Sequence, residues 1–181
     1  MKEVVKISTT LTLICLICAF LLALAYNAAE GKIALNQKKA IQESINVLAS
    51  QATKQKKTKI NGKNLWELYH NNDLIGYAVI ATGQGYGGEI KMMVVVDTDL
   101  KQIQGIEIIE SNETPGLGSK IQEKDFKNQF KNLKVIKPIE YTKEKPTKPN
   151  QIQTITGATI SSKSVVKILN KEIEELSDKI K

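Results

Sequence analysis

The apolar and polar positions of the chain change pattern twice in its first third. Residues 7–29 are apolar and carry no charge, which is long enough for a helix that spans a bilayer. Over residues 30–53, apolar residues recur at spacings of three and four, which predicts an amphipathic helix with one apolar stripe. The stripe consists of Ile41, Ile45, Leu48 and Ala52. Residues 51–59 are rich in lysine, and we predict a solvated connector there.

A cleavable signal peptide is the alternative to a retained membrane anchor. Ala23-Leu24-Ala25 resembles a cleavage site, but the apolar run is longer than the usual signal core. Length therefore favours a retained transmembrane helix. Cys15 and Cys18 both lie in this run, where packing or lipid contact is favoured over a redox pair, and no cysteine is left for a disulfide or thiolate metal site elsewhere.

The remaining chain has strand-like runs bounded by turn residues, with two helical patterns among them. Strands are predicted at residues 64–69, 74–82, 90–96, 102–109, 133–136 and 152–155. The run over 90–96 is almost continuously apolar, which indicates burial on both faces. Helices are predicted at 119–130 and 162–179, and an exposed loop at 137–150.

The last helix carries an apolar stripe that is expected to pack onto the sheet. The stripe consists of Val165, Val166, Leu169, Ile173, Leu176 and Ile180. The predicted fold class is α+β, with a mostly antiparallel sheet. The expected organisation is a transmembrane anchor over residues 1–29, a helical stalk and connector over 30–60, and a folded domain over 61–181.

Composition narrows the classes of function. The net charge of +7 comes from 26 lysines and no arginine, and the lysines alternate with acidic residues. Arginine is the preferred reader of phosphates and guanine edges, so we expect no nucleic-acid binding. His70 is the only histidine and falls in a predicted turn, so no metal site is expected.

The candidate chemistry begins at Thr156-Gly157-Ala158-Thr159, between a short strand and the last helix. Gly157 supplies backbone freedom, and Ser161 or Ser162 is expected to cap the helix. A helix N-terminus accommodates an anion, so a phosphate attached to Thr159 would lie in favourable electrostatics. The alternative interpretation is an ordinary capped turn.

Two further loops are rich in glycine. One is Gly83-Gln84-Gly85-Tyr86-Gly87-Gly88, which precedes a strand rather than a helix and so does not match a dinucleotide fingerprint. The other runs from Glu113 to Lys120 and contains the Pro115-Gly116 turn. Taken singly, each loop is equally compatible with a purely structural connector.

In their order along the chain, the three elements resemble those of the FMN-binding domain family. In that family FMN is joined through its phosphate to a threonine. The family pattern Asp-x-x-(Ser or Thr)-Gly-Ala-(Thr or Ser) corresponds here to residues 153–159, with Gln153 in place of aspartate. The resemblance covers roughly residues 74–166. It implies a covalent phosphoester between FMN and Thr159. The other cofactor-binding residues that it implies are Thr156, Gly157, Ala158, Ser161, Glu113, Thr114, Pro115, Gly116, Leu117, Gly118, Lys120, Gly85, Tyr86, Gly87 and Gly88.

The single anchor, the short chain and the motif order are most similar to the G-subunit family of the Rnf complex. That complex is a membrane ferredoxin:NAD+ oxidoreductase that couples electron flow to Na+ or H+ transport. The resemblance implies an electron-relay protein with no catalytic acid or base and with an extracytoplasmic domain. Its implied partners are the other membrane and peripheral subunits, membrane lipid, and a flavin transferase that attaches the FMN.

Three alternatives remain open at this point. The chain also resembles the C subunit of the Na+-translocating NADH:quinone reductase, which is usually longer. A free-standing flavinylated electron carrier outside the cytoplasm would share the same motifs. A membrane-anchored binding or assembly module without flavin would have glycine loops with a structural role only.

Overall fold

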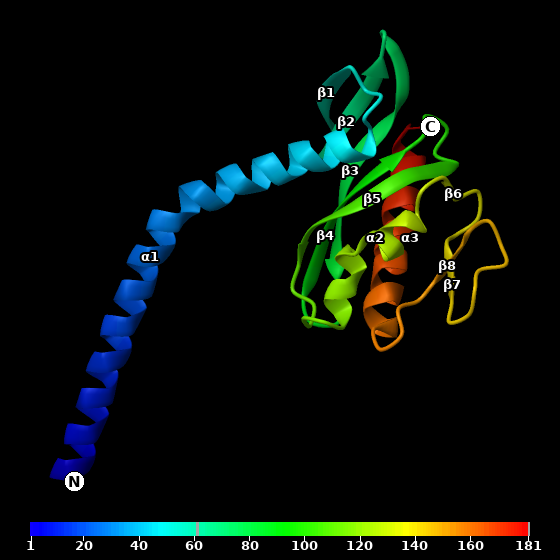
Figure 1. Ribbon diagram of the computed structural model, residues 1–181. Coiled ribbons are helices and arrows are strands. Elements are labelled where there is room, and N and C mark those ends of the chain that lie inside the picture. Colours follow the sequence, from blue (N-terminus) through cyan, green and yellow to red (C-terminus); the bar gives the residue numbers. More distant parts are fainter. Residues whose placement is uncertain (61, 181) are drawn as a thin grey trace. The chain divides into compact units, whose positions relative to one another are not determined.

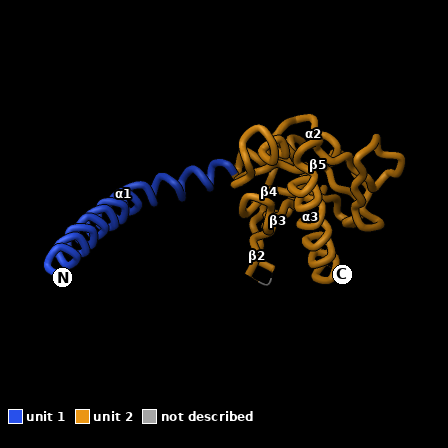
Figure 2. Tube along the Cα trace, turned by 90° about the horizontal axis from the view of Figure 1, so that it is seen from below, with its two compact units in different colours: residues 1–40 blue, residues 41–181 orange. Residues whose placement is uncertain are grey.

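The computed structural model describes residues 1–60 and 62–180, and the chain divides into two compact units, Met1–Ala40 and Ile41–Lys181 (Figure 2). One uninterrupted helix, α1 (Lys2–Leu48), contains both the predicted membrane span and most of the predicted amphipathic stalk. Within the described residues, α1 is the one helix long and apolar enough to cross a membrane. Its large apolar side chains before residue 36 are exposed, as expected of a lipid-facing segment.

The second unit is built on a six-stranded sheet whose strands follow one another in chain order (Figure 1). All five neighbouring pairs are antiparallel, which confirms the predicted fold class. The strands are β1 (Lys54–Ile60), β2 (Lys63–His70), β3 (Asp73–Gln84), β4 (Glu89–Val96), β5 (Gln102–Ser111) and β6 (Leu133–Lys134). His70 is exposed at the end of β2, as predicted.

The predicted connector over residues 51–59 is wrong, because most of it forms the edge strand β1. Its lysines remain in solvent and do not prevent pairing. Lys56 lies 3.5 Å from the Glu67 carboxylate, and the Lys57 ammonium lies 5.6 Å from the Trp66 ring centroid on the neighbouring strand. Lysines on an edge strand also disfavour pairing with a further chain.

Both faces of the sheet are covered, as the continuous apolar run in β4 predicts. Successive side chains point to opposite faces. Met92 and Val94 therefore join the larger core, whereas Met93 and Val95 join a second cluster. This second cluster is closed by the C-terminal end of α1, where Ile45 is fully buried. The predicted apolar stripe of α1 therefore packs against the sheet.

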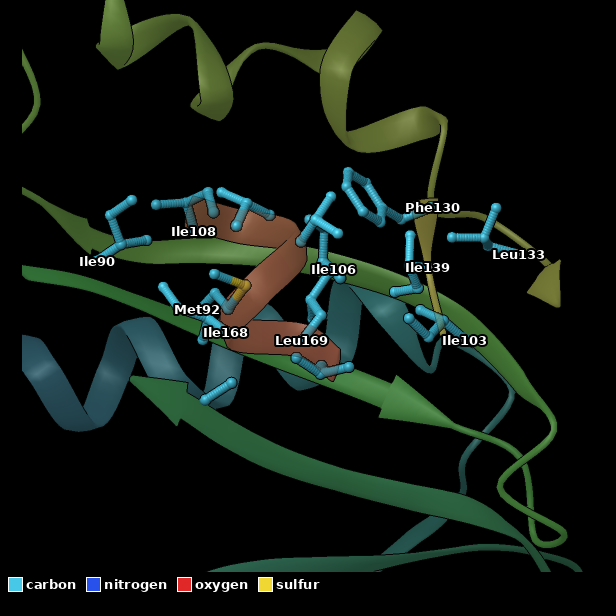
Figure 3. Packing of buried hydrophobic residues seen from close by; sticks show 14 of the residues in the cluster. Ile90, Met92, Ile103, Ile106, Ile108, Phe130, Leu133, Ile139, Ile168 and Leu169 are labelled. Carbon is cyan, nitrogen blue, oxygen red and sulfur yellow. The ribbon is translucent and has the colours of Figure 1, made fainter. Parts of the chain in front are cut away.

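The larger core lies between the sheet and the C-terminal helix α3 (Thr159–Ile180), which lies along this face of the sheet (Figure 1). Figure 3 shows Leu169 of α3 near Ile106 of the sheet, with Phe130 closing the cluster from the loop side. A Cβ atom at Gly83 would lie 2.5 Å from Ile168, so this glycine permits α3 to approach β3 closely. The expected packing of α3 onto the sheet is confirmed.

The segment between β5 and α3 differs from the prediction in two places. The helix predicted over 119–130 is split into a 3₁₀ turn, η1 (Gly118–Gln122), and α2 (Lys124–Asn128), because Glu123 is extended with ψ 149°. The loop predicted over 137–150 contains β7 (Glu140–Thr142), which pairs in parallel with β8 (Gln151–Gln153). The two strands predicted at 133–136 and 152–155 are shorter than expected.

An ion-pair cluster ties the β2 strand to α3. Lys63 lies 2.8 Å from Glu172 and 2.6 Å from Glu175, and Glu172 is buried. Burial alone would lower the pKa of Lys63, but its hydrogen bonds to the two carboxylates outweigh that effect and raise it. The hydrogen bond from Lys63 lowers the pKa of Glu175.

We expect Lys63→Met to lower the free energy of unfolding by about 1 kcal/mol at pH 7, because it leaves the Glu172 carboxylate unpaired. The pKa of Glu175 is lower in the folded state than its ordinary value of 4.5, so its ionised form stabilises the folded protein above pH 4.5. This contribution is lost as the pH falls through the folded-state pKa. The difference between variant and wild type should therefore shrink below pH 4.5. Urea unfolding followed by Trp66 fluorescence measures it. Lys171→Met, which removes a 3.9 Å pair with Glu175 at the surface, is the near-neutral control.

Candidate functional site

Three segments that are distant in the sequence converge on one cavity of about 390 Å³. They are the turn after β3, the loop between β5 and η1, and the start of α3. The lining residues are Tyr86, Glu113, Thr114, Leu117, Gly118, Gly157, Ala158, Thr159, Ile160 and Ser161. The cavity therefore brings together members of all three glycine-containing motifs. Its volume falls within the range of about 300–1,000 Å³ that is typical of ligand pockets.

The turn before α3 is closed by a hydrogen bond of 3.0 Å from the Ala158 N–H to the Ile155 carbonyl. Gly157 lies in this turn with φ +83°, a conformation that residues with a side chain rarely adopt. The backbone freedom predicted for Gly157 is therefore used. This turn also starts the helix at Thr159, three residues before the predicted start.

The prediction that Ser161 or Ser162 caps α3 is wrong, since both lie inside the helix. The Ser162 hydroxyl donates to the Ala158 carbonyl at 3.0 Å and accepts the Ile155 N–H at 3.0 Å, so it closes the preceding turn. The Ser161 hydroxyl instead donates to the Glu113 carboxylate at 2.7 Å. Neither hydroxyl is therefore available to the free N–H groups at the start of the helix.

Thr159 is the first residue of α3, half-buried and in the lining of the cavity. The first turn of an α-helix has N–H groups without an intrahelical acceptor. In α3 the first N–H group that bonds to a backbone carbonyl is that of Ser162, which donates to Ala158. The N–H groups of residues 159–161 precede it and have no carbonyl acceptor within the helix. A negatively charged group on the Thr159 hydroxyl would lie beside these groups and the positive end of the helix dipole.

Glu113 joins the three segments from inside. The residue is buried, with 6% of its surface exposed. One carboxylate oxygen accepts the backbone N–H groups of Tyr86 at 2.6 Å and Gly87 at 3.3 Å. The other accepts the Ser161 hydroxyl. The sequence indicated that Glu113 belongs to the site, but not that its carboxylate is bonded within the protein.

The glycines of the motifs make room for protein atoms. A Cβ atom at Gly85 would lie 2.1 Å from one Glu113 carboxylate oxygen, and one at Gly118 would lie 2.3 Å from the other. Cβ atoms at Gly87 and Gly88 would meet Asn112 at 2.5 and 2.7 Å. These four glycines therefore let the two loops pack closely, which shapes the cavity wall.

Three apolar side chains of the cavity lining are solvent-exposed: Tyr86 at 68%, Leu117 at 49% and Ile160 at 55%. Each comes from a different one of the three segments. Sequence reasoning named Tyr86 and Leu117 but missed Ile160, which directly follows the threonine. The signal that could have identified Ile160 is a large apolar residue in the first turn of the helix that lies outside the helix's apolar stripe. Together these side chains form an apolar surface suited to a flat aromatic ring.

Some of the predicted site residues lie outside the cavity lining. Thr156, Pro115 and Gly116 are exposed, and Gly116 has φ +75°. Lys120 lines a separate hollow that also contains Gln153. Gln153 is bound to Gln129 by two hydrogen bonds, of 2.7 Å from its own N–H and 3.2 Å to its carbonyl.

The geometry favours binding over acid–base chemistry. Glu113 and Ser161 form the one bonded carboxylate–hydroxyl pair of the cavity lining, but both are buried and their hydrogen-bonding atoms are engaged with each other. Within the described residues, no cluster of three metal-ligating side chains occurs. The cavity is thus lined by a threonine at the start of a helix, where an anion would be favoured, and by apolar side chains.

Comparison with known proteins gives consistent results. The sequence model of FMN-binding domains matches residues 85–174. The chain is 35% identical to the G subunit of the proton-translocating ferredoxin:NAD(+) oxidoreductase complex of Clostridium ljungdahlii, over 97% of this chain and 93% of that protein. It is 29% identical to the G subunit of the ion-translocating oxidoreductase complex of Methanosarcina acetivorans, over 97% and 96% of the two chains.

Among solved structures, NqrC of Shewanella oneidensis superimposes with a TM-score of 0.57. It is 17% identical in sequence, and the match covers 68% of this chain and 66% of that one. This likeness shows a shared fold over about two thirds of this chain.

Proposed function

This chain belongs to the family of G subunits of ion-translocating ferredoxin:NAD(+) oxidoreductase complexes, and we propose that it is the membrane-anchored flavoprotein electron relay of such a complex. The chain is membrane-anchored through the apolar part of α1. The observation that carries the proposal is that Thr159 lines a cavity that members of all three glycine-containing motifs also line.

The residues present fit FMN. The phosphate of FMN requires donors and positive potential, which the first turn of α3 supplies. The isoalloxazine ring requires an apolar surface, which the exposed side chains of Tyr86, Leu117 and Ile160 supply. When bound, the flavin supplies electron-transfer chemistry that protein side chains lack, while the protein orients the ring and tunes its electronic environment.

We propose further that FMN is attached covalently at Thr159. The hydroxyl oxygen forms a bond to the phosphorus of an FMN group that is carried by a flavin dinucleotide. The phosphoanhydride bond of that donor breaks, a nucleoside monophosphate leaves, and the hydroxyl proton is released. The product is a phosphoester, and the chain gains the mass of FMN less one water. A flavin transferase is the partner that this step requires.

A covalent tether suits a relay at a membrane surface, because a carrier held by one bond is not lost to bulk solvent. The turn containing Gly157 fixes the direction in which α3 begins, and the packing of Val165 and Leu169 holds that helix on the sheet. The protein thereby keeps Thr159 at a defined place in the cavity. No proton transfer by a side chain is needed for this role.

The partners and the membrane topology belong to the same proposal. A relay protein of this kind contacts the other membrane and peripheral subunits that donate and accept its electrons, and α1 contacts lipid. We place the second unit on the extracytoplasmic side. The family relationship supports a place in a multi-subunit complex, and the apolar segment of α1 supports attachment to the membrane.

The test is purification of the chain from membranes of its own host under mild detergent. We expect co-purification with polytopic membrane subunits, and flavin fluorescence that remains with this chain in a denaturing gel. A flavin-labelled chain that purifies alone would favour a free-standing carrier. Native material without fluorescence, and with an unmodified peptide around residue 159, would refute the flavoprotein assignment.

A further inference from the structure

The buried carboxylate of Glu113 lies where the three segments of the cavity meet. Both of its oxygens accept hydrogen bonds, from the N–H groups of Tyr86 and Gly87 and from the Ser161 hydroxyl. A carboxylate that is 6% exposed is costly to bury unless such bonds compensate for lost water. Three donors therefore bond to its two oxygens, so neither buried oxygen lacks a hydrogen-bond partner.

The surrounding backbone is adapted to this carboxylate. Gly85 faces one oxygen and Gly118 faces the other, and a Cβ atom at either position would lie 2.1 or 2.3 Å from an oxygen. The carboxylate is therefore enclosed by the two loops. Its bond to Ser161 reaches the first turn of α3, two residues after Thr159.

We propose that Glu113 is a positioning residue for flavin attachment and a determinant of the flavin's reduction potential. This inference rests on the proposed function. Through Ser161, Glu113 fixes the first turn of α3 against the two loops, so that the Thr159 hydroxyl faces the cavity. Misplacing a reactive group by about 1 Å can cost about a hundredfold in rate, so this one link is expected to matter.

The proposed effect of Glu113 on the reduction potential of the flavin depends on the charge of its carboxylate. Glu113 is one of the residues that line the cavity, and in the described part of the chain the bonded partners of its carboxylate are uncharged donors. A negative charge beside a bound flavin opposes the addition of electrons to the ring, and the opposition is stronger where solvent is excluded. Glu113 therefore lowers the reduction potential of the flavin relative to a neutral residue of the same shape.

The test uses the full chain, prepared without flavin and then incubated with a purified flavin transferase and a flavin dinucleotide. Glu113→Gln keeps the size of the side chain and one acceptor for the loop N–H groups, but removes the charge. We expect attachment to slow about tenfold, measured as in-gel flavin fluorescence over time. The potential of the loaded variant, followed by flavin absorbance during a redox titration, should rise.

Two companion variants make the result decisive. Ser161→Ala breaks the link to α3 but keeps the charge, so it should slow attachment without raising the potential. Glu110→Gln removes an exposed carboxylate from β5, three residues before Glu113, and should change neither. Circular dichroism checks that each variant is folded.

Each outcome bears on the inference. If Glu113→Gln has the same attachment rate and the same reduction potential as the wild type, the inference is overturned. The proposed function still stands in that case, provided that the wild-type chain itself carries flavin. If Glu113→Gln does not fold, Ser161→Ala decides, since slowed attachment supports the positioning role and an unchanged rate refutes it. A wild-type chain that takes up no flavin removes the proposed function itself.

Discussion

Thr159→Ala should lose all covalent flavin and yet remain folded. The substitution removes the one oxygen to which the proposed phosphoester can form. Within the described part of the chain this hydroxyl makes no hydrogen bond, and its residue is half-exposed. A substitution of this kind usually changes stability by less than about 0.5 kcal/mol. Intact mass and in-gel fluorescence measure the flavin, and circular dichroism measures the fold.

Thr159→Ser is the matched control, because it keeps a hydroxyl at the same position. It should retain covalent flavin when it is produced alongside an active transferase. Flavin that persists in the Thr159→Ala protein after denaturation would show that another residue is the attachment point. Loss of the circular dichroism signal in that protein would show that the threonine has a structural role that its contacts do not indicate.

The sequence was most informative where a pattern is local. The continuous apolar run of β4 predicted burial on both faces, because side chains alternate along a strand whatever its neighbours are. The stripe of α3 predicted its buried face in the same way, and Val165, Val166 and Leu169 are buried. The family resemblance carried by the three motifs implied one site, and members of all three line one cavity.

Local reasoning failed where tertiary contacts override composition. The residues of β1 are mostly lysine, which has little preference for strands, and so they predicted a connector. The strand is stabilised instead by its pairing with β2 and by the contacts of Lys56 and Lys57 with that strand, which compensate for the low strand propensity of its residues. An edge strand needs only one paired side, so its composition is weakly constrained.

The interior of the site could not be predicted for a different reason. The bond between Ser161 and Glu113 joins residues that are 48 positions apart. A serine near a helix start is, on average, a good capping residue. Only the approach of the second loop turns Ser161 towards Glu113 instead. Glycine-rich loops predict close approach to a ligand, whereas Gly85 and Gly118 admit the Glu113 carboxylate.

Gly157→Val should impair both folding and flavin attachment. At φ +83° a side chain with a branched Cβ is strained, and strain of this kind costs about 1–3 kcal/mol. The nearest atom to an added Cβ is 3.5 Å away on Leu117, an ordinary contact, so the backbone angle and not crowding causes the effect. Relief of the strain would rotate the turn and displace Thr159 from the cavity. Urea unfolding and in-gel fluorescence measure the two effects.

Two controls separate strain in general from strain at the site. Gly62→Val introduces the same branched residue at φ +82° between β1 and β2, where, its two chain neighbours aside, no atom of the described residues lies within 4 Å of an added Cβ. It should destabilise the protein by a similar amount and leave attachment unchanged. Gly157→Asn should be milder than valine, because asparagine tolerates the left-handed conformation. Wild-type flavin content in Gly157→Val would show that the angle at residue 157 does not position Thr159, and the turn would then serve the fold alone.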